Sequence, residues 1–158
     1  MVPASSARHA ASNANGRLID VNGPVICGIE DSNGARAAAV AYELAERYGL
    51  PLVYVHVLVG SADVSHAARM LLETAPQGVS QLSIETGHHP ADRLVELAVE
   101  RGASFLVVGN HGPRASLLGS ISADISRRAP CPVIVVPSTA RPAAFERFAL
   151  ETARRQVA

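Results

Sequence analysis

The sequence predicts a single α/β domain in which a mostly parallel β-sheet carries helices on both faces. Short runs of continuous apolar residues alternate along the chain with longer segments whose apolar residues recur at helical spacing. Continuous apolar runs are typical of strands buried on both faces, and their alternation with helices is typical of parallel sheets. The length of 158 residues favours one domain.

Five segments are predicted to be strands. Four are continuous apolar runs: residues 25–29, 52–59, 105–108 and 133–136. The remaining segment, residues 79–86, alternates polar and apolar side chains. Alternation gives one apolar and one polar face, which is expected of a strand at the edge of the sheet.

Four helices are predicted between these strands: residues 33–48, 62–74, 90–101 and 117–129. Gly49 and Gly102 follow the first and third helices, where glycine commonly terminates a helix. Pro76 and Pro130 end the second and fourth, and Pro90 stands at the first helical position of the third.

The two ends of the chain differ from this pattern. Residues 1–22 are rich in Ala, Ser and Asn without periodicity, so we expect a disordered N-terminal lead. The domain is expected over residues 23–138. Residues 139–158 are expected to be a helical tail, with the helix over residues 145–155.

Composition excludes several classes of function. Fourteen acidic residues balance fourteen basic ones, so the basic excess of a dedicated nucleic-acid binder is missing. All fourteen bases are Arg, which excludes a Walker lysine, a Schiff-base lysine and a pyridoxal-phosphate anchor. The apolar runs are too short to span a bilayer, and the N-terminus has no apolar signal segment. We therefore expect a cytoplasmic protein without a membrane partner.

A predicted strand leads through a glycine-rich turn into a helix between residues 107 and 122. Gly109 and Gly112 let a ligand approach the backbone, and Gly119 lies at the start of the helix, whose free N–H groups suit an anion. Further donors for a phosphate are Arg114, Ser120 and Ser122. The alternative is purely structural, with glycines that only form turns and a serine that only caps the helix.

Five blocks in this order resemble the universal stress protein family: residues 25–32, 52–57, 103–112, 118–122 and 131–136. The resemblance covers residues 23–138. It implies a flavodoxin-like, doubly wound, five-stranded parallel sheet of order 3-2-1-4-5, and usually a homodimer. One branch of this family binds ATP through the pattern G-x2-G-x9-G-[ST], whereas another branch lacks the pattern and does not bind ATP.

The resemblance to the ATP-binding branch implies a set of nucleotide-binding residues: Glu30, Asp31, Val57, Val108, Gly109, Asn110, His111, Gly112, Arg114, Gly119, Ser120 and Ser122. Glu30 stands where the family has an Asp that contacts the nucleoside. Val57 and Val108 match adenine-side positions, and Ser122 matches a position that reaches the terminal phosphate. Only six residues separate Gly112 from Gly119, where the family has nine. The shorter loop and the longer Glu30 side chain each remove part of the family's site.

The resemblance therefore implies a stress-response domain that binds ATP or a related adenine nucleotide, with Mg²⁺ as its companion ion, as a regulatory ligand. The alternative is a dimeric interaction module of the same fold that binds no nucleotide. A flavodoxin-type electron carrier is disfavoured, because the first strand lacks a phosphate loop and the acidic pair after it would repel a phosphate. No nucleophile elbow, HExxH motif or carboxylate pair is visible, so we expect at most slow ATP hydrolysis.

Three further expectations concern the edge strand and the histidines. Residues 132–137 form an apolar edge strand, which favours pairing with a second copy in a homodimer. The rival is that the helix over residues 145–155 covers that edge. His88 and His89 are expected in a surface turn, and His56 is expected to be a hydrogen-bonded residue of the core or of a crevice.

Overall fold

The computed structural model describes residues 10–12, 18–30, 34–75, 81–110 and 120–137. Its main feature is a five-stranded, all-parallel sheet in the order β5-β4-β3-β6-β7. The strands are β3 (Val25–Gly28), β4 (Leu52–Leu58), β5 (Gln81–Thr86), β6 (Phe105–Asn110) and β7 (Val133–Pro137). Numbered along the chain, these five strands have the order 3-2-1-4-5, which confirms the predicted doubly wound fold.

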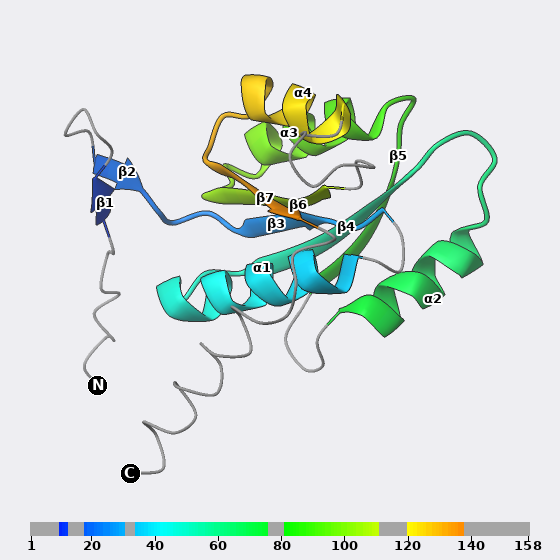
Figure 1. The fold of residues 1–158 in the computed structure, drawn as a ribbon, viewed down its shortest axis with the longest axis horizontal. Coiled ribbons are helices and arrows are strands. Elements are labelled where there is room, and N and C mark those ends of the chain that lie inside the picture. The colour runs from blue at the N-terminus through cyan, green and yellow to red at the C-terminus, as the bar shows by residue number, and fades with distance from the viewer. Residues whose placement is uncertain (1–9, 13–17, 31–33, 76–80, 111–119, 138–158) are drawn as a thin grey trace, which may run out of the picture.

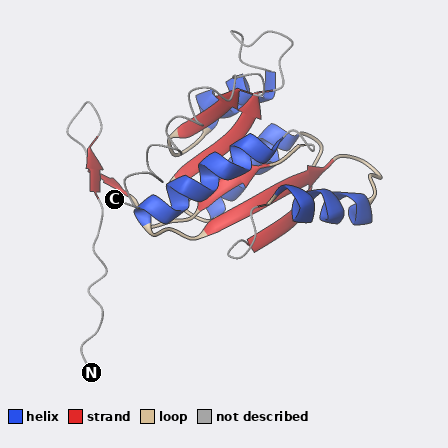
Figure 2. Cartoon of the chain, turned by 60° about the horizontal axis from the view of Figure 1, so that its bottom comes forward, coloured by secondary structure: helices blue, strands red, loops and turns tan. Residues whose placement is uncertain are grey.

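Helices cover both faces of the sheet (Figures 1 and 2). They are α1 (Ala35–Tyr48), α2 (Val64–Thr74), α3 (Pro90–Glu100) and α4 (Ser120–Arg128). In Figure 1, α1 and α2 lie below the sheet, and α3 and α4 lie above it. All four predicted helices are thereby confirmed.

Alternating residues of the strands supply two hydrophobic cores. Cys27, Tyr54 and Val107 face α1, and the Tyr54 hydroxyl donates to the carbonyl of Ala38 at 2.9 Å. Ile26 and Leu106 belong to the other core, which packs against α3 and α4. Because the central strands are buried on both sides, their sequences read as continuous apolar runs.

The ends of the elements follow local chemistry. Gly49 adopts φ 63° after α1, a left-handed conformation that glycine reaches without steric cost. The Asp63 side chain accepts a hydrogen bond from the Ser65 N–H at 2.8 Å, so α2 begins two residues later than predicted. Strand β6 continues through Gly109 and Asn110, which pair with β7. The prediction that Gly109 begins the turn is therefore wrong, because parallel pairing needs only the backbone of a glycine.

A short antiparallel pair lies outside the main sheet, within the segment predicted to be a disordered lead. It joins β1 (Ala10–Ser12) to β2 (Leu18–Asp20), apart from the five-stranded sheet (Figure 1). Runs of three residues are too short to show a strand periodicity in the sequence. The predicted tail, residues 139–158, lies outside the described residues.

Strand β7 forms one edge of the sheet. Its side chains Val133, Ile134 and Val135 are half-buried in the single chain, and Val136 is buried. The homodimer through residues 132–137 stays a prediction. In the described part of the chain, no helix is long and apolar enough to cross a membrane.

Candidate functional site

A cavity of about 230 Å³ opens at the carboxyl ends of the three central strands. Residues from the ends of β3, β4 and β6 and from two helices line it: Gly28, Ile29, Glu30, Val55, His56, Val57, Pro90, Leu94, Val108, Gly109 and Ile121. In doubly wound sheets, ligands bind at this end of the strands, where the winding reverses direction. Here β3 is the reversal point, because the chain proceeds from it first to β4 and later to β6.

The walls of the cavity are mostly apolar. Val57 and Val108 are 9% and 4% exposed, and they approach from the strands on either side of β3. Gly28 permits the close packing of α3 against β3, because a Cβ at this position would lie 2.8 Å from Cδ1 of Leu94. The apolar lining suits a flat, weakly polar ring system more than a fully charged ligand.

The backbone of β4 adds a polar edge beside this apolar lining. The Ile29 N–H donates to the Val55 carbonyl at 2.8 Å, and the Gly87 N–H donates to the Leu58 carbonyl at 3.1 Å. Val55 therefore presents its peptide groups toward β3, and Leu58 presents its carbonyl toward β5. Peptide groups alternate in direction along a strand, so the N–H and C=O of Val57 also face the β3 side. The last β3–β4 pair is Gly28 with Val55, so the Val57 peptide edge lies beyond the end of that ladder.

His56 lies half-buried on the cavity wall, which confirms the prediction of a hydrogen-bonded crevice residue. Its Nδ1 is 2.7 Å from the carbonyl oxygen of Ile29. A carbonyl can only accept, so Nδ1 carries the hydrogen and donates it. Glu30 is exposed at the rim, one residue beyond that carbonyl.

The structure brings together four of the residues that the sequence assigns to the site: Glu30, Val57, Val108 and Gly109 line the cavity. Asn110 and Ser122 are both buried. Each directly follows a cavity residue in the chain, Asn110 at the end of β6 and Ser122 in the first turn of α4. Ser120 is the first residue of α4. The remaining predicted site residues lie outside the described part of the chain: Asp31, His111, Gly112, Arg114 and Gly119.

Sequence reasoning did not assign several cavity residues to the site: Gly28, Ile29, Val55, Pro90, Leu94 and Ile121. Gly28 could have been found from the sequence, because a glycine within a predicted strand often marks the close approach of another element. Pro90, Leu94 and Ile121 reach the cavity only because two helices cross the same face of the sheet. No local pattern in the sequence shows that convergence.

A wider groove of about 510 Å³ lies between α3 and α4, lined in part by His89, Asp92, Asp124 and Arg127. Its two carboxylates are already engaged, because Arg128 binds Asp92 at 2.7 Å and Asp124 at 2.6 Å. Within the described residues, no cluster of three His, Cys, Asp or Glu side chains is placed to hold a metal ion. His88 and His89 are exposed, as predicted for a surface turn.

Comparison with known proteins decides the family. Residues 60–137 match the sequence model of the universal stress protein family. A universal stress protein of Thermus aquaticus is 30% identical over 120 residues, which cover 64% of this chain and 88% of the relative. The chain belongs to the universal stress protein family.

Two other members of the universal stress protein family show how far the likeness extends. Universal stress protein YxiE of Bacillus subtilis is 34% identical over 67 residues, which cover 40% of this chain and less than half, 45%, of YxiE. A solved universal stress protein in complex with cAMP is 27% identical, with a TM-score of 0.60. That match covers 75% of this chain and 99% of the solved one.

Proposed function

We propose that the cavity at the carboxyl ends of β3, β4 and β6 binds an adenine nucleotide as a regulatory ligand. The observation that carries this proposal is the combination of two apolar walls with a Val57 peptide edge that, among the described residues, lies beyond the last β3–β4 pair. The relative solved with cAMP supports the ligand class, because it shares 27% of its residues and the fold with this chain.

The chemistry of adenine matches both features of the cavity. The purine ring is flat and would pack between Val57 and Val108, which removes apolar surface from water. Its Watson–Crick edge carries a donor beside an acceptor, and the Val57 C=O and N–H form the complementary pair. The cavity of about 230 Å³ is smaller than the roughly 300–1,000 Å³ of typical ligand pockets, so it suits the base and leaves sugar and phosphates outside.

Two features are placed to receive the remainder of the nucleotide. The exposed Glu30 carboxylate at the rim can accept hydrogen bonds from ribose hydroxyls. Helix α4 begins at Ser120, and Ile121 lines the cavity, so the positive end of the helix dipole lies beside the site. ATP and its Mg²⁺, cAMP and related adenine nucleotides all fit this description.

Filling the cavity should abolish binding. Ile121 is half-buried and lines the cavity, so Ile121→Trp would place an indole in the space proposed for the base. Calorimetric titration of the wild type with ATP and with cAMP should show saturable binding. The variant should lose at least tenfold in affinity, which corresponds to about 1.4 kcal/mol.

The matched control is Val99→Trp, because Val99 is 63% exposed on α3 and does not line the cavity. This variant should bind as the wild type does. Absence of binding to either nucleotide by the wild type would refute the proposal, and an interaction module without a nucleotide would then be the better description. Equal binding by the wild type and Ile121→Trp would place the nucleotide elsewhere.

A further inference from the structure

His56 occupies a point at which the β3–β4 ladder would otherwise continue. The Ile29 N–H already pairs with the Val55 carbonyl at 2.8 Å. In a parallel ladder the next bond would join the Ile29 carbonyl to the Val57 N–H. The register instead ends at Gly28 and Val55, and the Ile29 carbonyl accepts a hydrogen from the His56 imidazole at 2.7 Å.

We infer that His56 is a positioning residue, which ends the β3–β4 ladder at the cavity and so keeps the Val57 peptide edge open for the base of the nucleotide. The inference rests on the proposed nucleotide site. In this role His56 does not need to touch the ligand. Its side chain bonds the Ile29 carbonyl, and this bond leaves the Val57 N–H available to the base.

The geometry explains why a histidine serves here. The imidazole donates through Nδ1, which is only two bonds from Cβ. The donor therefore stays close to the β4 backbone and can bond the Ile29 carbonyl just beyond the end of β3. Nδ1–H is present both in this neutral tautomer and in the imidazolium. The donor for the bond to Ile29 is therefore present in either form of the ring.

Hydrogen exchange tests the inference without any ligand. In the full 158-residue chain, the Val57 amide should exchange readily in the wild type. In His56→Val the Ile29 carbonyl is released, and the Val57 N–H should close onto it and exchange at least tenfold more slowly. His56→Asn keeps an N–H donor at the position of Nδ1 and should behave as the wild type. An unchanged exchange rate of Val57 in His56→Val would overturn the inference.

A second comparison remains decisive if His56→Val does not fold. His56→Gln keeps an amide but moves its donor one bond further from Cβ, so the Val57 amide should be protected in His56→Gln and not in His56→Asn. Equal protection in these two variants would overturn the inference. His66→Val on α2 is the matched control, because His66 is an exposed histidine and the same substitution should leave Val57 unaffected.

Calorimetric titration then tests whether the role of His56 affects nucleotide binding. His56→Val should weaken ATP binding about tenfold, because the base loses one hydrogen-bonding partner. 1-Deaza-ATP lacks the ring nitrogen N1, which is the acceptor for the Val57 N–H, so the variant should bind it with a much smaller loss. Equal losses for the two ligands would overturn the link to the base. If exchange at Val57 changes as expected and the wild type binds no nucleotide, the proposed function fails while the role of His56 in the ladder stands.

Discussion

Gly23→Ala should destabilise the protein by about 3 kcal/mol, at the upper end of the usual cost of overpacking. Gly23 lies two residues before β3, and a Cβ there would overlap the backbone carbonyl of Gly102. Neighbouring bonds hold this junction together, because the Ser104 N–H donates to Pro24 at 2.9 Å and the Ser104 hydroxyl donates to Gly23 at 2.8 Å. Backbone atoms cannot turn aside as a flexible side chain can, so the starts of β3 and β6 must separate.

Thermal unfolding measures this effect, and the expected loss corresponds to a fall in Tm of roughly 6–12 °C for a domain of this size. Gly49→Ala is the informative control. Gly49 has φ 63° and open space where a Cβ would stand, so alanine there meets conformational strain and no overlap. That strain costs about 1–2 kcal/mol. Equal stabilities of Gly23→Ala and the wild type would show that the strand junction is looser than described.

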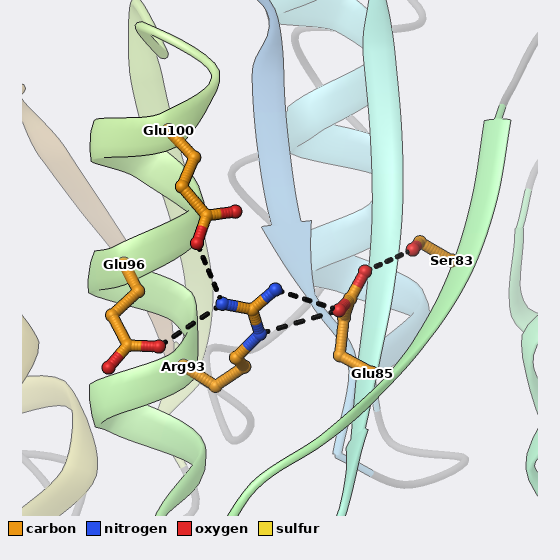
Figure 3. A network of polar contacts seen from close by, with 5 residues as sticks. All are labelled: Ser83, Glu85, Arg93, Glu96 and Glu100. Carbon is orange, nitrogen blue, oxygen red and sulfur yellow. Dashed lines mark hydrogen bonds and ion pairs between the residues drawn. The ribbon is translucent and has the colours of Figure 1, made fainter.

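Arg93→Met should remove the centre of a polar network that joins β5 to α3 (Figure 3). The guanidinium of Arg93 binds Glu85 at 3.1 Å, Glu96 at 3.1 Å and Glu100 at 3.0 Å. Glu85 also accepts a hydrogen bond of 2.6 Å from the Ser83 hydroxyl. The Glu85 side chain is only 18% exposed, so loss of Arg93 leaves a poorly hydrated carboxylate near two others.

The expected cost is about 1–2 kcal/mol, between that of an exposed ion pair and that of a buried pair that loses one partner. Methionine retains the aliphatic packing of the arginine stem, so the loss reports mainly on charge. Glu96→Gln is the control, because Glu96 is 61% exposed and its pair should contribute little. Denaturant unfolding at neutral pH compares the two variants, and equal effects would contradict a central role for the Glu85 contact.

The pH dependence of this effect has a definite sign. The Ser83 hydroxyl and then Arg93 hold the pKa of Glu85 below its ordinary value of 4.5. Its contribution to stability is therefore complete above that value and is lost as the pH falls through the lowered pKa. The stability difference between wild type and Arg93→Met should be largest at neutral pH and should shrink as the solution is acidified below about pH 4.5. A difference that grows on acidification would contradict this assignment.

The fold could be predicted from the sequence because its strands are buried on both faces and read as uninterrupted apolar runs. Strand ends were harder to predict, as β6 shows: Gly109 and Asn110 resemble a turn in the sequence but pair with β7 through their backbones. The ladder, which depends on a strand distant in sequence, outweighs the local preference of glycine for turns.

The candidate site was predictable in part, because the residues at strand ends follow from the strand order. Val57 and Val108 end two strands that flank β3, so knowledge of the strand order is enough to bring them together. Leu94 comes from α3, which packs over Gly28, and Ile121 comes from α4. No spacing in the sequence encodes the convergence of these two helices on the cavity. The hydrogen bond between the His56 side chain and the Ile29 carbonyl, from which we infer an open peptide edge at Val57, joins two segments distant in sequence, so no local pattern indicates it.

An NMR titration of the isotopically labelled protein with ATP, repeated with cAMP, tests the central claim most directly. The claim is that an adenine base enters the cavity between β4 and β6. Saturable amide shifts are expected at Val57, Val108 and Gly109, with little change at Gly23 and Gly102 at the opposite end of the sheet. Absence of shifts at saturating nucleotide, or shifts confined to the α3–α4 groove around His89 and Asp92, would contradict the account.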